Sequence, residues 1–236
     1  MNSVLILDDD QYFRALVAAY LQDEGLTTVE ARTGSEATDA LSRQKFALVI
    51  VDYRLPDCDG LSWINYHRLN GVETPFIVLS GIALNNQKQT RMRNLLGVEH
   101  VLQKPINPFE FIRLIRKQLH MKVDTDPSVC DLEGRDEMQF FYDADLDEEL
   151  DGELEDIKET YLHDLPALLR KLANTIEKSN ESGFLTDTGK NAIMEAHKIR
   201  GTAGSLSLEG ISDLAGKIET ALKKAVRQSK KISPTT

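Results

Sequence analysis

The 236-residue chain has 28 lysines and arginines against 38 aspartates and glutamates, so its formal net charge is −10. This excess of negative charge argues against a nucleic-acid-binding surface and fits contact with protein partners. No apolar run approaches the ~20 residues that span a bilayer, and the first residues lack the basic region of a signal peptide. We therefore expect a cytoplasmic protein without a membrane segment. Its length and its 41% of hydrophobic residues suit two domains of ordinary size.

The first 120 residues alternate short apolar runs with segments of helical periodicity. The predicted strands are Val4–Leu7, Thr27–Ala31, Ala47–Val51, Pro75–Leu79 and His100–Gln103. Each gap between them is long enough for a crossover helix, and the near-continuous apolar runs are typical of parallel strands covered on both faces. Helices are expected over 11–24 and 107–119, with Asp10 and Asn107 as N-caps. The pattern predicts an α/β domain with a five-stranded parallel sheet over residues 1–120.

The rest of the chain shows no strand pattern. Turn-forming residues and the loss of any period place a linker at 121–143. A helical domain then occupies 144–236, with three amphipathic stripes that suggest a bundle. The first stripe runs from Leu150 to Ile176, the second from Ile193 to Leu206 and the third from Ile211 to Val226.

Five polar residues stand at or just after the ends of predicted strands: Asp8, Asp9, Asp52, Ser80 and Lys104. Because the carboxyl ends of parallel strands share one edge of the sheet, these groups should converge there. Three clustered carboxylates push a proton onto one of them unless a cation is present. Hard oxygen ligands at low count suit Mg²⁺. The metal, the lysine and the hydroxyl together would provide most of what phosphoryl transfer requires.

The residues around this edge resemble the response-regulator receiver domain over essentially all of residues 1–120. The resemblance rests on four segments, namely 5–10 (LILDDD), 51–60 (VDYRLPDCDG), 78–81 (VLSG) and 103–105 (QKP). It implies a flavodoxin-like (βα)5 fold with Asp52 as the phosphoacceptor. It also implies that Asp8, Asp9, Asp52 and the carbonyl of Arg54 surround Mg²⁺, and that Ser80 and Lys104 contact the phosphoryl group.

In that family the peptide bond between the lysine and the following proline is commonly cis, so the resemblance implies a cis Lys104–Pro105 bond. One position departs from the family pattern, because Val101 stands where a Tyr or Phe usually precedes the lysine by three residues. The usual aromatic switch is therefore in doubt, whereas phosphorylation is not.

His197 is the second candidate phosphoacceptor. Ala196 and Ile199 belong to the apolar stripe, so His197 should point away from it and be exposed, with Gly201 and Gly204 along its own face. Two glycines inside a helix cost about 1 kcal/mol each relative to alanine, which makes sense if another group must approach closely. A neutral imidazole nitrogen is a competent phosphoryl acceptor.

The sequence around His197 resembles the histidine phosphotransfer (HPt) domain over roughly residues 148–228. The family motif His-x-x-Lys-Gly is matched by the segment from His197 to Gly201, with Arg200 in place of the lysine. Lys198 and Arg200 are expected to contact the phosphoryl group. No ATP-binding motif is found, so we expect a phosphotransfer protein and not a kinase.

The two resemblances together predict a two-component phosphorelay protein. Its partners would be a sensor histidine kinase and other receiver or HPt proteins, and the direction of flow between Asp52 and His197 is left open. One alternative is a phosphorylation-gated interaction module whose helical domain serves only dimerisation or docking. A second is an enzyme whose helical output is controlled by the receiver, although no further nucleophile–base pair supports it.

An HPt domain is normally a four-helix bundle, yet no fourth amphipathic helix follows Val226. An apolar face should therefore need cover. The segment from Glu137 to Tyr142, the helices of the receiver or a second copy of the chain could each provide it. A homodimer through the helical domain is the favoured expectation.

Overall fold

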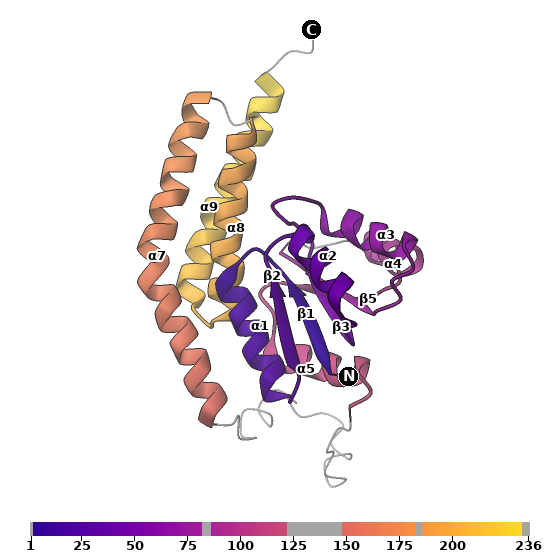
Figure 1. The fold of residues 1–236 in the computed structure, drawn as a ribbon. Coiled ribbons are helices and arrows are strands. Elements are labelled where there is room, and N and C mark those ends of the chain that lie inside the picture. The colour runs from indigo at the N-terminus through magenta and orange to yellow at the C-terminus, as the bar shows by residue number, and fades with distance from the viewer. Residues whose placement is uncertain (1, 82–85, 122–147, 183–185, 233–236) are drawn as a thin grey trace, which may run out of the picture.

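A computed structural model describes residues 2–81, 86–121, 148–182 and 186–232. Figure 1 shows an α/β domain with three long helices standing along one side of it. The five strands are parallel and lie in the order β2-β1-β3-β4-β5, as expected for the predicted fold class. Their bounds are β1 Ser3–Leu7, β2 Thr27–Ala31, β3 Leu48–Asp52, β4 Phe76–Ser80 and β5 Val98–Gln103. The helices of this domain are α1 Gln11–Asp23, α2 Gly34–Arg43, α3 Gly60–Leu69, α4 Asn86–Leu96 and α5 Pro108–Gln118.

The strands are apolar along both faces because each face contacts a separate core. In β1, Val4 and Ile6 belong to the core on one side of the sheet, whereas Leu5 and Leu7 belong to the core on the other. Side chains of a strand alternate between the faces, so a sheet covered on both sides needs an unbroken apolar run. Four strands begin and end within one residue of the prediction. β5 begins at Val98, two residues earlier than predicted.

Both predicted N-caps are confirmed. The Asp10 carboxylate accepts hydrogen bonds from the main-chain N–H groups of Tyr12 and Phe13 at the start of α1. Asn107 accepts from the N–H of Glu110, and a proline occupies the first turn of α5. The caps satisfy N–H groups that have no partner within the helix. They also set where the chain leaves the strand-end edge of the sheet.

The second half of the chain forms three helices: α7 Glu148–Ser182, α8 Asp187–Ser205 and α9 Glu209–Ile232. Their shared core contains Leu172, Ala196, Ile199 and Leu222. The three predicted stripes are thus confirmed as a helical bundle. Within the described ranges, no helix combines the length and the apolar character that crossing a membrane requires.

Helix α1 of the α/β domain covers the remaining face of the bundle (Figure 1). The rings of Tyr12 and Tyr161 meet edge to face with centroids 5.1 Å apart, and the Tyr12 hydroxyl donates to Asp164 Oδ2 at 2.6 Å. Leu150 and Leu206 of the bundle belong to the same core as the buried residues of α1. Of the three covers considered from the sequence, the structure therefore shows the receiver's own helix.

Three expectations are not tested by the described residues of a single chain. The predicted linker at 121–143 and the alternative cover at 137–142 lie, from residue 122 onward, outside the described residues. The homodimer stays a prediction, but the apolar face that motivated it is already covered by α1.

Candidate functional site

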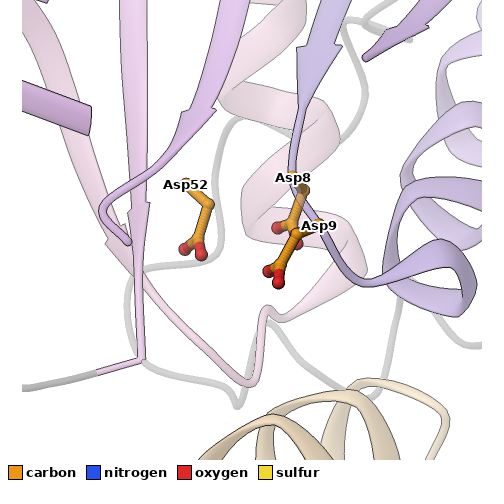
Figure 2. A group of neighbouring side chains, drawn as sticks. All are labelled: Asp8, Asp9 and Asp52. Carbon is orange, nitrogen blue, oxygen red and sulfur yellow. The ribbon is translucent and has the colours of Figure 1, made fainter. Parts of the chain in front are cut away.

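Three carboxylates meet at the carboxyl edge of the sheet, as the sequence predicted. Asp8 and Asp9 follow β1, and Asp52 is the last residue of β3. Figure 2 shows the three side chains pointing toward a common space, and one oxygen of each lies within 4.8 Å of the others. Asp9 Oδ1 is buried and has no hydrogen-bond partner among the described residues. Such an oxygen calls for a cation, so this donor set fits a hard divalent metal ion.

Lys104, one residue after β5, supplies a fixed positive charge to the cluster. Its Nζ atom forms an ion pair with Asp8 and lies 3.4 Å from Asp52 Oδ1. Burial alone would lower the pKa of this ammonium, but the carboxylates of Asp52 and Asp8 outweigh burial and raise that pKa above its ordinary value. Lys104 is therefore charged throughout the neutral range.

One ammonium is not enough for three carboxylates. Burial raises the pKa of Asp52 to about 7, with Lys104 acting against this shift and the charges of Asp8 and Asp9 adding to it. The pKa of Asp8 is also raised, mainly by burial. A protonated carboxyl group cannot attack a phosphoryl donor, so Asp52 needs further positive charge to be a nucleophile near neutral pH.

The remaining predicted residues of the strand-end site lie around Asp52. Ser80 ends β4 and is buried, and its carbonyl accepts a hydrogen bond from the main-chain N–H of Lys104 at 2.8 Å. The main chain at Arg54 pairs with that at Asp59. A side chain at Gly60 would meet the Asp52 carbonyl oxygen at 2.2 Å, so only glycine fits where this loop turns into α3. The Lys104–Pro105 bond is cis, as the resemblance implied.

His197 lies against this same edge of the sheet. A Cβ atom added to Gly81, the residue after β4, would fall 1.6 Å from His197 Nε2. The ring thus uses the space that the glycine leaves open. The expectation that His197 points away from the bundle core is confirmed, but its predicted exposure is wrong. Only 19% of its side chain is exposed, because the α/β domain covers it.

The other ring nitrogen of His197 is held from within the bundle. Nδ1 hydrogen-bonds to Glu219 Oε1 of α9 at 2.9 Å, and the Glu219 side chain is 2% exposed. Arg200 and Lys223 also form ion pairs with Glu219. Burial lowers the pKa of His197 although Glu219 opposes this shift, so the ring is neutral at pH 7. With the proton on Nδ1 and the carboxylate accepting it, Nε2 carries the free lone pair.

The sequence did not identify Glu219 as a residue of the site. Its only local signal is an acidic residue next to Ile218 in the apolar stripe of the third helix. Such residues are usually solvated, and nothing in the stripe shows that His197 and two cations surround this one.

The two domains also meet through polar contacts beside the acidic cluster. Lys198 of α8 forms an ion pair with Asp9, and the Thr202 hydroxyl donates to Asp10 Oδ2 at 2.6 Å. The main-chain N–H of Ile106 donates to Ser205 Oγ at 3.2 Å. One face of α8 therefore contacts both the end of β1 and the loop after β5.

The close approach predicted from the helical glycines is confirmed. A Cβ atom at Gly204 would lie 2.9 Å from Pro105 Cβ, and one at Gly201 would lie 3.6 Å from Lys104 Cβ. The glycines let the backbone of α8 pack against the loop that carries Lys104. As a result, Asp52, Lys104 and His197 line a single pocket between the domains.

The predicted site residues thus form one assembly built from both halves of the chain. The pocket is lined by Asp8, Asp9, Asp52, Lys104, His197 and Lys198, and Lys198 also pairs with Asp9. Arg200 instead pairs with Glu219 at 3.3 Å. The roles of these residues in phosphoryl transfer stay predictions.

Comparison with known proteins finds similarity along both halves of the chain. The chain is 34% identical over 112 residues to the Regulator of RpoS of Escherichia coli K12, which covers 48% of this chain and 33% of that protein. It is 33% identical over 116 residues to an uncharacterized 14.6 kDa protein encoded in the sodA1 3′ region of Leptolyngbya boryana, covering 48% of this chain and 87% of that one. The chain thus spans about a third of the length of the Regulator of RpoS.

Among solved structures, the RstA receiver domain of Klebsiella pneumoniae matches with 24% identity and a TM-score of 0.46, covering 50% of this chain and 98% of that domain. The Vibrio cholerae chemotaxis protein CheY4 matches with 26% identity and a TM-score of 0.46, over 50% and 98%. The response regulator receiver domain family matches residues 4–116, and the Hpt domain family matches residues 156–235. The chain therefore belongs to the two-component phosphorelay signalling proteins, with a response-regulator receiver domain followed by an Hpt domain.

Proposed function

We propose that Asp52 and His197 are the two phosphoacceptors of this protein and that a phosphoryl group passes between them within one chain. The observation that carries this proposal is the shared pocket, in which Nε2 of a neutral His197 lies against Gly81 beside Asp52 and Lys104. A pair already held in one pocket needs no bimolecular encounter, which is a large kinetic advantage.

Asp8, Asp9 and Asp52, with the Arg54 carbonyl, would hold Mg²⁺. When bound, the metal would supply positive charge that keeps Asp52 ionised and offsets the charge of the phosphoryl oxygens. Lys104 and the Ser80 hydroxyl would contact the same oxygens. The raised pKa of Asp52 and the unpartnered oxygen of Asp9 support this assignment.

In transfer to the histidine, the lone pair of His197 Nε2 attacks the phosphorus of the Asp52 acyl phosphate. An N–P bond forms, the P–O bond to Asp52 breaks, and the electron pair returns to the Asp52 carboxylate. The proton stays on Nδ1, and the positive charge that develops on the ring is stabilised by Glu219. The reverse reaction uses the same groups.

The partners follow from this chemistry. A sensor histidine kinase would load the receiver, and a second receiver would exchange phosphoryl groups with His197. Both proteins would need access to residues that the docked arrangement shields. A homodimer through the helical domain would require a face other than the one α1 occupies, or the release of α1.

The test labels the full chain with radioactive acetyl phosphate and Mg²⁺ and follows the chemical stability of the label. The wild type should acquire acid-labile, base-stable phosphohistidine alongside base-labile acyl phosphate. Asp52→Asn should take no label, and His197→Gln should hold only the acyl phosphate. If the wild type behaves like His197→Gln, the helical domain serves only for docking and the relay proposal fails.

Transfer within one chain is separated from transfer between chains by dilution. The rate of phosphohistidine formation in the wild type should not change over a hundredfold dilution. Gly81→Ala should slow it strongly while Asp52 still labels, because the added Cβ would occupy the position of Nε2. Gly152→Ala is the matched control, since a Cβ there meets no atom within 4 Å. A rate proportional to chain concentration would contradict the intramolecular step.

A further inference from the structure

Lys198 connects the Hpt domain to the receiver's acidic cluster. Its ammonium pairs with Asp9 Oδ2 although 189 positions separate the two residues in sequence. Lys198 is 30% exposed and Asp9 12%, so the pair is partly shielded from water. Burial lowers the pKa of Lys198, but the Asp9 carboxylate more than offsets this, and the pKa is raised. The group is therefore a permanent cation.

Asp9 belongs at the same time to the metal-binding cluster. Its Oδ1 atom is buried without a partner among the described residues, while Oδ2 holds Lys198. A divalent cation bound to the cluster would share this carboxylate with the ammonium. Two cations on one carboxylate repel each other, and partial burial weakens the screening of that repulsion.

The charge of the site changes with its chemical state. Three carboxylates and Lys104 leave an excess of negative charge, which attracts Lys198. A divalent cation cancels that excess. A phosphoryl group on Asp52 then replaces a single negative charge with about two and restores the attraction. Asp10 and Glu195 also act on Lys198, but neither belongs to the cluster of three carboxylates that would bind the metal.

We propose that Lys198 senses the charge of the receiver site and sets how firmly the Hpt domain docks. Mg²⁺ without a phosphoryl group weakens the docking, and phosphorylation of Asp52 strengthens it again. The Hpt domain would thus be released while the receiver waits for its kinase and recaptured once Asp52 is loaded. This inference rests on the Mg²⁺ site of the proposed function.

Thermodynamic linkage makes the coupling measurable without any transfer reaction. If Mg²⁺ weakens docking through Lys198, the docked Lys198 must weaken Mg²⁺ binding by the same factor. Because Lys198 belongs to the other domain, its removal can alter metal affinity only if the domains dock in solution.

The test is calorimetric titration of Mg²⁺ into the full-length wild type, Lys198→Met and Lys190→Met. Lys190 lies on the same helix and pairs with Asp187 on the surface, with 70% of its side chain exposed, so its replacement matches the loss of charge. Lys198→Met should bind Mg²⁺ about tenfold more tightly, the size expected for a divalent and a monovalent cation several ångströms apart in water. Lys190→Met should match the wild type.

A second titration includes beryllofluoride, which mimics a phosphoryl group on a carboxylate. There the advantage of Lys198→Met should vanish or reverse. Equal Mg²⁺ affinities of Lys198→Met and the wild type would overturn the inference, as would an equal gain in Lys190→Met or an advantage that beryllofluoride leaves unchanged. If no variant binds Mg²⁺, the metal site of the proposed function fails as well. If phosphotransfer between Asp52 and His197 is not observed but the Mg²⁺ affinities differ as expected, the proposed transfer fails and this inference stands.

Discussion

The two nitrogens of His197 have separate surroundings, and this separation decides what the residue can do. Nδ1 is bonded to Glu219 inside the bundle, and Nε2 lies at the receiver. A buried carboxylate beside a neutral imidazole fixes the tautomer and orients the ring. Burial acts to raise the pKa of Glu219, but Lys223 and His197 outweigh burial, so this pKa is lowered.

Glu219→Gln should lower the pKa of His197 below its value in the wild type. Burial already places that pKa below the ordinary 6.5, and Glu219 is the main group that opposes the shift. Glutamine can keep a hydrogen bond but not the charge, and Lys223 and Lys104 would then act on the ring uncompensated. An NMR pH titration of the imidazole in full-length wild type and variant measures the difference, with Glu209→Gln on the exposed start of α9 as the control.

The lowered pKa of His197 also makes the stability of the fold depend on pH. Because the folded state favours the neutral ring, the contribution of His197 is complete above about pH 6.5 and is lost as the pH falls through the folded pKa. Glu219→Gln should therefore show a steeper loss of stability on mild acidification than the wild type. A His197 pKa that is unchanged or raised in the variant would mean that Glu219 does not act on the ring.

At the scale of elements, the sheet and the helices follow from local patterns that the sequence displays. β1, β3 and β4 are apolar on both faces because both faces are covered, and Asp10 and Asn107 mark the starts of α1 and α5. The start of β5 is less evident, because Glu99 interrupts the apolar pattern and is exposed at the edge of the sheet. The acidic residues at the strand ends then predict the site, because the carboxyl ends of parallel strands meet at one edge of the sheet.

The docking of α8 on the receiver has no comparable local signature. Lys198 and Asp9, or Thr202 and Asp10, are nearly two hundred residues apart, and no period or spacing relates such pairs. The sequence contains only an indirect sign in Gly201 and Gly204, whose cost in a helix predicts that something approaches. What approaches, namely the Lys104–Pro105 loop, follows only from the tertiary structure.

These two glycines should respond differently to substitution by alanine. A Cβ at Gly201 would be 3.6 Å from Lys104 Cβ, an ordinary contact, so Gly201→Ala should gain up to about 1 kcal/mol of stability from helix propensity. A Cβ at Gly204 would be 2.9 Å from the Pro105 ring and 3.0 Å from Ser212 Oγ, so Gly204→Ala should lose that gain and loosen the docking.

Chemical denaturation of both variants tests this contrast, with each glycine serving as the control for the other. Small-angle scattering should show a larger radius of gyration for Gly204→Ala than for Gly201→Ala. Equal stabilisation of the two variants, with no change in shape, would show that the loop does not press on α8 in solution.

For the whole molecule, the decisive element is α1, whose core includes residues of both the sheet and the helical bundle. Its buried side chains pack against the sheet, and Tyr12 packs against Tyr161 of α7. The side chains of Asp52 and His197 are only 13% and 19% exposed in this arrangement. If Asp52 and His197 are the phosphoacceptors, as proposed, a kinase or a second receiver must meet an open form of the chain, and the contacts of α1 and α8 determine how often that form occurs.

The position of α1 also predicts how the chain assembles. Because α1 covers the face that a fourth helix would occupy, the full chain should be a monomer at micromolar concentration in light scattering. The isolated helical fragment 144–236 lacks α1 and would expose Tyr161, Leu150 and Leu206, which are buried in the full chain. An exposed apolar face of this kind favours self-association, so the fragment should dimerise. Tyr161→Lys in the fragment should reduce the dimer, because it places a charge in that face. A dimeric full chain would show instead that a second surface joins two copies. A monomeric fragment would mean that three helices bury enough apolar area by themselves and that α1 serves only to dock the bundle on the α/β domain.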